Sequence, residues 1–111
     1  MQKLDIIIRP EKFQQVMEAL DGAGFHGMTV TDVRGRGDQK GICLQYRGKM
    51  MKVDLIPKVK IEMIVSDEKI DAVISIIKKE AYTGKNGDGR IFISPVSKSV
   101  KVRTGEVITE W

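Results

Sequence analysis

Hydrophobic spacing along the first thirty residues changes from a strand pattern to a helix pattern. Residues 4–8 read Leu-Asp-Ile-Ile-Ile, which is typical of a buried strand. Pro10 and Glu11 suit the first turn of a helix. Apolar residues then recur at helical spacing at Phe13, Val16, Met17 and Leu20. Gly22 and Gly24 are expected to stop this helix.

The rest of the chain repeats the pattern. Met28, Val30 and Val33 begin a second predicted strand. In the third strand, one face carries Val59, Ile61, Met63 and Val65, and the other carries Lys58, Lys60, Glu62 and Ile64. Ser66 can cap a second helix, whose apolar stripe is Ile70, Val73, Ile74 and Ile77. The run Ile91-Phe92-Ile93 with Val96 predicts a last, buried strand.

The element order is strand, helix, strand, strand, helix, strand. This order predicts an α+β, ferredoxin-like βαββαβ fold with both helices on one face of an antiparallel sheet. Residues 35–54 interrupt the pattern and are predicted to form a long loop, which in a compact domain is usually functional. The other sheet face needs a cover, so we expect a homo-oligomer.

Composition limits the classes of function. The 111 residues suffice for one domain, with 41% hydrophobic and 31% charged residues and a net charge of +4. This mild positive charge favours anionic ligands but is far from the dense basic stripe of a nucleic-acid binder. No apolar run is long enough to insert in a membrane, and Cys43 is the single cysteine. With no signal-peptide pattern at the N-terminus, we expect a cytoplasmic location.

The segment Tyr-Thr-Gly-Lys-Asn-Gly-Asp-Gly-Arg, residues 82–90, is the first candidate for chemistry. Glycines allow backbone N–H groups to surround phosphate oxygens, and Lys85 and Arg90 add positive charge. An ordinary turn between a helix and a strand is an equally good reading, because turns also collect glycine.

Three other segments carry charge or glycine. The glycine-rich stretch 35–41 resembles a dinucleotide fingerprint only weakly, because its spacing is wrong and no helical pattern follows. Lys58, Lys60 and Glu62 cluster on the polar face of the third strand. Lys101 and Arg103 lie on one side of an extended segment and would suit a polyphosphate. A solvated strand face and a charged tail are the plain alternatives for the last two.

Side chains for classical catalysis are scarce. His26 is the single histidine and is better explained as a structural or exposed residue than as a general base. Cys43 has no neighbouring histidine, and no metal-ligand spacing of cysteine and histidine occurs. The aromatic residues that a ferredoxin-like sheet needs for RNA are missing.

Taken together, the segments resemble the PII signal-transduction family along essentially the whole chain. The most specific match is Thr-Gly-Lys-Asn-Gly-Asp-Gly-Arg-Ile-Phe-Ile, residues 83–93, which fits the family's C-terminal signature. Supporting stretches are IIIRPEK (6–12), GMTVTDVRGRG (27–37), QKG (39–41), YRG (46–48), LIPKVKIE (55–62) and VRTGE (102–106).

The resemblance implies a single PII domain over residues 1–111 that forms a compact homotrimer. Residues 37–54 would be the family's T-loop, residues 82–90 its B-loop, and residues 100–104 a basic C-terminal segment. ATP or ADP would bind in the clefts between subunits, and 2-oxoglutarate would bind beside ATP through a bridging Mg²⁺. The T-loop would reorder with these ligands and dock on target proteins.

The same resemblance implies roles for individual positions. Nucleotide contacts would come from Thr29, Gly35, Gly37, Asp38, Gln39, Glu62, Ile64, Gly87, Asp88, Gly89, Arg90, Lys101 and Arg103, the last two across the interface. Gln39 would coordinate Mg²⁺. The 2-oxoglutarate site would be made by Gln39, Lys40, Gly41 and Lys58.

Three positions depart from the family pattern. Met51 stands where many members have the uridylylated tyrosine, and Lys49 stands where some have a phosphorylated serine. Neither modification can occur at those positions. Asp38 stands where arginine or lysine is usual, which can change nucleotide affinity or the discrimination between ATP and ADP.

The resulting interpretation is a non-enzymatic sensor of ATP, ADP and 2-oxoglutarate that regulates nitrogen metabolism. An ammonium transporter, glutamine synthetase, a biosynthetic kinase and nitrogenase are all open as targets, and a transporter target would recruit the protein to the inner membrane face. The alternatives are a slow ATP-hydrolysing enzyme of the same fold, a nitrogenase-associated variant that senses adenylates, and a structural trimer without nucleotide sites.

Overall fold

The computed structural model describes residues 1–37, 42–46, 49–53 and 55–111, with side chains for residues 1–37 and 55–111. The strands are β1 (Gln2–Ile8), β2 (Thr29–Gly35), β3 (Ile42–Tyr46), β4 (Lys49–Val53), β5 (Ile56–Val65), β6 (Gly89–Pro95), β7 (Ser99–Val100) and β8 (Val107–Ile108). The helices are α1 (Phe13–Gly22) and α2 (Ile70–Glu80), each preceded by a 3-10 turn, Pro10–Lys12 and Asp67–Lys69.

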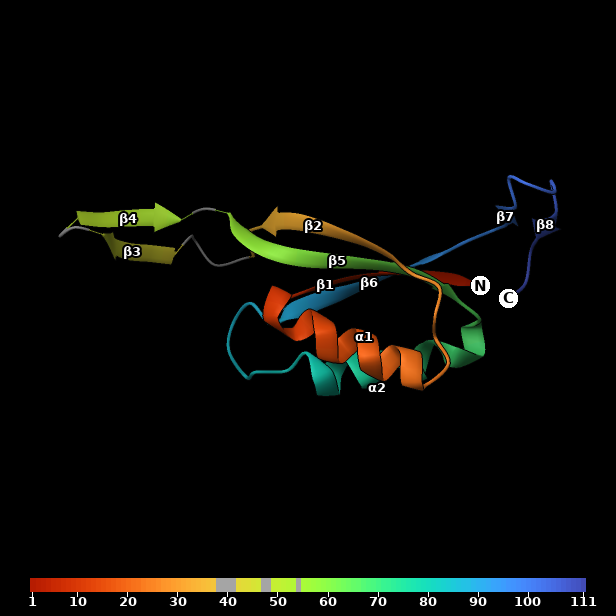
Figure 1. Cartoon of the computed structure of the whole chain (residues 1–111), viewed down its shortest axis with the longest axis horizontal. Coiled ribbons are helices and arrows are strands. Elements are labelled where there is room, and N and C mark those ends of the chain that lie inside the picture. Colours follow the sequence, from red (N-terminus) through yellow and green to blue (C-terminus); the bar gives the residue numbers. More distant parts are fainter. Residues whose placement is uncertain (38–41, 47–48, 54) are drawn as a thin grey trace.

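Four strands form the main sheet in the order β2-β5-β1-β6, and all neighbouring pairs are antiparallel. Helices α1 and α2 lie side by side under one face of this sheet (Figure 1). The predicted α+β, ferredoxin-like fold is confirmed. None of the described helices is both long and apolar enough to cross a membrane.

The core lies between this sheet face and the two helices. Alternate residues of β1 and β5 point into it, as the sequence pattern of β5 predicts, and each helix contributes one apolar stripe. Its buried apolar residues are Leu4, Ile6, Ile8, Val16, Leu20, Val59, Ile61, Met63, Val65, Val73, Ile77 and Ala81. Burial of this apolar area drives the helices onto the sheet.

The opposite sheet face carries a ladder of alternating charges. Lys60 Nζ lies 3.0 Å from Glu62 Oε1 and 3.9 Å from Asp5 Oδ1, and Lys3 Nζ lies 3.6 Å from the same Asp5 oxygen. The four side chains are between 23% and 37% exposed, although no helix covers them. Asp5 Oδ1 is buried and has no hydrogen-bond partner among the described residues.

Strand β6 was predicted to be buried, but in the structure much of it is exposed. It lies at the edge of the sheet and pairs with β1 alone, so Phe92 and Ile93 are 51% and 45% exposed. The prediction was wrong because an apolar run shows that a strand needs a cover but cannot show that the same chain supplies it.

Two local expectations also change. Within residues 35–54, which were expected to form an irregular loop, β3 and β4 form an antiparallel hairpin with Leu44 opposite Met51. The alternation of Ile42, Leu44 and Tyr46 is the signal for β3, and the glycines around it obscure that signal. Ser66 precedes the second helix, but its side chain makes no capping hydrogen bond.

The last fifteen residues leave the sheet and form the short β7–β8 hairpin. Lys101 N–H donates to Glu106 O (2.9 Å), and Gly105, at a φ of +73°, closes the turn. Figure 1 shows this hairpin and the β3–β4 hairpin at opposite ends of the 59 Å long axis.

Candidate functional site

The segment between α2 and β6 is a tight loop that three glycines make possible. Gly84, Gly87 and Gly89 have φ values of +87°, +94° and +131°, a region that residues with a Cβ rarely adopt. At Gly89 a Cβ would also collide with the Ile7 carbonyl oxygen of β1. Gly89 therefore serves the close pairing of β6 with β1, a role that its place in a glycine-rich motif does not reveal.

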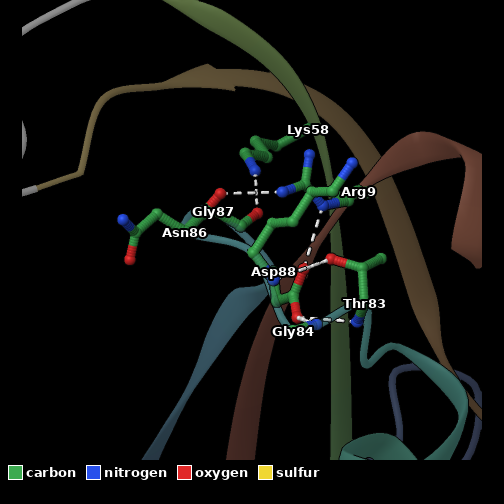
Figure 2. A network of polar contacts seen from close by, with 8 residues as sticks. Arg9, Lys58, Thr83, Gly84, Asn86, Gly87 and Asp88 are labelled. Atoms are coloured by element: carbon green, nitrogen blue, oxygen red, sulfur yellow. Dashed lines mark hydrogen bonds and ion pairs between the residues drawn. The ribbon is translucent and has the colours of Figure 1, made fainter.

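The Asp88 carboxylate holds the loop together from inside. Its Oδ2 accepts from the N–H groups of Thr83 (2.7 Å) and Gly84 (2.9 Å), and its Oδ1 accepts from the Thr83 hydroxyl (Figure 2). The carboxylate thus ties the start of the loop to its end.

Arg9 braces the loop from β1. Its Nε donates to Asp88 Oδ1 at 3.0 Å, and its Nη2 donates to the Asn86 carbonyl at 2.7 Å. The sheet places it there, because the pair Ile8–Gly89 ends the β1–β6 ladder and Arg9 and Asp88 come next on either strand. Sequence reasoning missed Arg9. The available signal was its position between a strand and Pro10, which keeps the residue extended.

Lys58 reaches the same loop from β5. Its Nζ donates to the Gly87 carbonyl, directly beside the Arg9 guanidinium (Figure 2). Two positive side chains from neighbouring strands therefore fix two successive carbonyl groups of the loop, those of Asn86 and Gly87.

These contacts shift two pKa values. The hydrogen bonds from the Thr83 hydroxyl and N–H, with those from Gly84 and Arg9, hold the pKa of Asp88 far below its usual range, against the opposing effect of desolvation. Burial, and then the positive charge of Arg9, lower the pKa of Lys58. Lys58 and Arg9 repel each other, and an anion placed between them would relieve that repulsion.

Two pockets border this arrangement. One, of about 390 Å³, is lined by Lys58 together with Pro10, Asp32, Val33, Arg34 and Pro57. The other, of about 340 Å³, lies on the α2 side and includes Asp88, Gly89 and Arg90 in its wall. No group of three His, Cys, Asp or Glu side chains suited to a metal occurs in the part of the chain that is described.

The residues expected to hold adenosine lie together on the open sheet face. Thr29 and Glu62 are direct cross-strand partners on β2 and β5, and Ile64 follows on the same face of β5. They are not at the loop itself, because Glu62 lies four residues along the strand from Lys58, about 13 Å at the rise of a β-strand.

The remaining predicted positions fall in three places. Gly35 ends β2 opposite Ile56, and Gly37 follows it. Asp38, Gln39, Lys40 and Gly41 lie outside the described residues. Lys49 and Met51 lie on β4, where the backbone alone is described.

Among the described residues of the predicted site, Lys101 and Arg103 are placed by the fold at the far end of the molecule from the loop. Both lie in the β7–β8 hairpin, where Lys101 Nζ is 3.7 Å from Glu106 Oε2. The loop between α2 and β6 lies at the other end of the helices (Figure 1). One chain therefore cannot bring Lys101 or Arg103 to its own Asp88 loop.

Comparison with known proteins identifies the family. The family model described as "Nitrogen regulatory protein P-II" matches residues 1–106. The chain belongs to the P-II family. A P-II relative, nitrogen regulatory protein P-II 2 of Methanothermobacter thermautotrophicus, is 56% identical over 106 residues, which are 96% of this chain and 92% of the relative.

Two bacterial P-II proteins extend the similarity. Nitrogen regulatory protein GlnK of Escherichia coli is 46% identical, and nitrogen regulatory protein P-II of Cereibacter sphaeroides is 47% identical, each over 96% of this chain and 95% of the relative. The predicted family is therefore confirmed. A role in nitrogen regulation as a signalling protein follows for this P-II chain; below, the name B-loop is used for residues 82–90, as the sequence resemblance implies.

Proposed function

We propose that this P-II protein is a non-enzymatic sensor that binds ATP or ADP on the B-loop and 2-oxoglutarate beside it. The observation that carries the proposal is the braced B-loop. Its carbonyl groups at Asn86 and Gly87 are tied to Arg9 and Lys58, whereas the N–H groups of Gly87 and Asp88 donate to no acceptor among the described residues. Free N–H groups in a glycine-rich turn form an anion nest.

The phosphates of a nucleotide would take the place of the missing acceptors. The N–H groups of Gly87, Asp88 and Gly89 would donate to phosphate oxygens, with Arg90 nearby. The Asp88 carboxylate would stay within the protein, because it already accepts hydrogen bonds from Thr83, Gly84 and Arg9. Thr29, Glu62 and Ile64 would hold the adenosine part, with Gly35, Gly37 and Asp38 beside them.

A homotrimer completes this site in the proposal. Lys101 and Arg103 are too distant to serve the B-loop of their own chain, so they would serve a neighbouring one (Figure 1). Exposed apolar residues support such contacts: Phe92, Ile93, Val100, Val102 and Val107 are all at least 45% exposed. Apolar surface of this extent is typical of an interface.

The pair Lys58 and Arg9 supports the binding of a dianion. In the proposal the Lys58 ammonium, which has three N–H donors, keeps its bond to the Gly87 carbonyl and donates a second hydrogen bond to a carboxylate of 2-oxoglutarate, and backbone groups from Gln39 to Gly41 complete the site. Mg²⁺ held by Gln39 would neutralise charge between the dianion and the nucleotide phosphates. 2-Oxoglutarate should therefore bind appreciably with MgATP and poorly with ADP, and it should tighten ATP binding by the same factor.

Targets would be recognised through the T-loop, residues 37–54. The β3–β4 hairpin projects from the end of the sheet, which leaves it accessible to another protein (Figure 1). The proposed targets are proteins of nitrogen metabolism, such as an ammonium transporter, glutamine synthetase or nitrogenase. Ligand-dependent reordering of this segment would then change its affinity for a target.

Calorimetric titrations test the proposal. We expect ATP and ADP to bind the wild-type protein, and 2-oxoglutarate to bind in the presence of MgATP. Lys58→Ala should weaken 2-oxoglutarate binding most and ATP binding to a lesser degree, because Lys58 also holds the Gly87 carbonyl. Equal 2-oxoglutarate affinity with MgATP, with ADP and without nucleotide would contradict the proposed site. Steady release of ADP from ATP in the same samples would favour the enzymatic alternative.

A further inference from the structure

We propose that Arg9 is a positioning residue that orients the phosphate-binding N–H groups of the B-loop, an inference that rests on the nucleotide site proposed above. Arg9 lies outside the glycine-rich segment, 79 residues before Asp88. Its guanidinium makes two contacts with the loop, one to the Asn86 carbonyl and one to the Asp88 carboxylate (Figure 2).

Peptide geometry explains how these contacts act on the nest. All peptide bonds in the described chain are trans, so the C=O and N–H of one peptide group point in opposite directions. Arg9 holds the carbonyl of Asn86, and therefore the N–H of Gly87 points away from Arg9. Lys58 holds the carbonyl of Gly87, and the N–H of Asp88 points away from Lys58 in the same manner.

Gly87 makes this bracing necessary. At a φ of +94° it is the residue with the greatest backbone freedom at the tip of the loop. Without a brace, the peptide groups on either side of Gly87 could turn, and the two N–H groups would no longer be held in place. A nest that is fixed before the ligand arrives binds more tightly, because no ordering is needed on binding.

The geometry requires the fork of an arginine. Nε and Nη2 reach two acceptors at once, at 3.0 Å and 2.7 Å, and those acceptors belong to residues two apart in the chain. A lysine would bring the same charge but a single nitrogen, so it could hold either the carbonyl or the carboxylate. Both side chains are partly buried, with Arg9 23% and Asp88 22% exposed.

Arg9→Lys separates positioning from direct attraction of the nucleotide by positive charge. If Arg9 positions the loop, calorimetry should show ATP affinity at least about tenfold weaker in Arg9→Lys, as expected for the loss of a charged hydrogen bond. Lys12→Met, which removes a charge without touching the B-loop contacts, should stay within about twofold of wild type. ATP affinity in Arg9→Lys equal to wild type would overturn the positioning role.

A double-mutant cycle tests whether Arg9 acts through Asp88. Arg9→Met and Asp88→Asn should each weaken ATP binding. The ATP affinity of the double variant should be close to that of the single variant with the lower affinity. Losses that multiply in the double variant would overturn the bracing of the loop through Asp88.

Hydrogen exchange of the ligand-free protein gives a readout that needs no nucleotide. In Arg9→Lys the N–H groups of Thr83 and Gly84, which donate to Asp88, should exchange faster than in wild type, while the core amides of β5 stay unchanged. Unchanged exchange of these two groups overturns the bracing role. If exchange is faster in Arg9→Lys but the wild-type protein binds no ATP, the bracing role stands and only the proposed nucleotide site is refuted.

Discussion

Single residues in the B-loop have different roles although the sequence presents them as one motif. Gly87 lies at the tip, where a Cβ would meet the flexible ends of Arg9 and Lys58 at 3.4 and 3.5 Å. Gly89 lies against the backbone of β1, which cannot move aside. Asp88 directs its carboxylate into the loop, where it accepts from the N–H groups of Thr83 and Gly84.

The two glycines should therefore respond differently to alanine. Gly89→Ala introduces a collision with the Ile7 carbonyl and a strained φ of +131°, and it should cost at least about 1–3 kcal/mol in the free energy of unfolding. Gly87→Ala meets no backbone but shares the strain of a positive φ (+94°), so it should cost less stability than Gly89→Ala and should also weaken ATP binding. Urea unfolding and calorimetry of both variants measure the two effects. Equal stability of Gly89→Ala and wild type would contradict the close β1–β6 contact.

Asp88 should also give the protein a specific dependence on pH. Its pKa is lowered in the folded state, so the carboxylate stabilises the fold above its unfolded pKa of about 4, and this stabilisation is lost as pH falls through the folded value. Wild type should be more stable than Asp88→Asn at pH 7, and the difference should shrink below about pH 4. Thermal unfolding of both proteins from pH 7 to pH 3 measures it. A difference that stays constant would exclude the carboxylate as its source.

Apolar side chains on central and edge strands of the main sheet contribute differently to stability, because those at the edge are more exposed. Val30 of β2 and Ile61 of β5 are cross-strand partners on the helix-covered face. Ile61 is fully buried in the centre of the sheet, whereas Val30 at the edge is 42% exposed. The same substitution should therefore have unequal effects on these neighbouring strands.

We expect Ile61→Ala to lower the free energy of unfolding by about 2–5 kcal/mol, because it leaves a cavity between the sheet and the helices. Val30→Ala should cost less than about 1 kcal/mol, since its side chain is already partly in water. Denaturant unfolding at low protein concentration compares the two. Similar losses would contradict the strand order β2-β5-β1-β6.

The whole molecule has one sheet face without a cover. That face carries the charge ladder of Lys3, Asp5, Lys60 and Glu62, and Phe92 lies beside it opposite Asp5. Buried Asp5 Oδ1 lacks a hydrogen-bond partner among the described residues, which a single chain in isolation does not explain. A second and a third copy of the chain would bury this face.

Light scattering of the purified protein should therefore give about three times the 12.5 kDa chain mass at micromolar concentration. Phe92→Asp should shift the mass toward the single chain, because it places a carboxylate opposite Asp5 on the sheet face that the other copies would bury. Val30→Asp, at the other edge of the sheet, is the matched control for an added charge. A stable monomer of the wild-type chain would contradict the homotrimer.

Local periodicity in the sequence was sufficient to predict both helices and the faces of β5, and the glycines of residues 82–90 marked the loop between α2 and β6, because these features depend on neighbours within a few residues. Pairing between distant segments was decided by the fold. The β1–β6 register brings Arg9 to Asp88 across 79 residues and requires a glycine at position 89, and the strand order leaves β6 at an edge. Such contacts depend on which strands become neighbours, and side-chain periodicity along one segment carries no information about that choice.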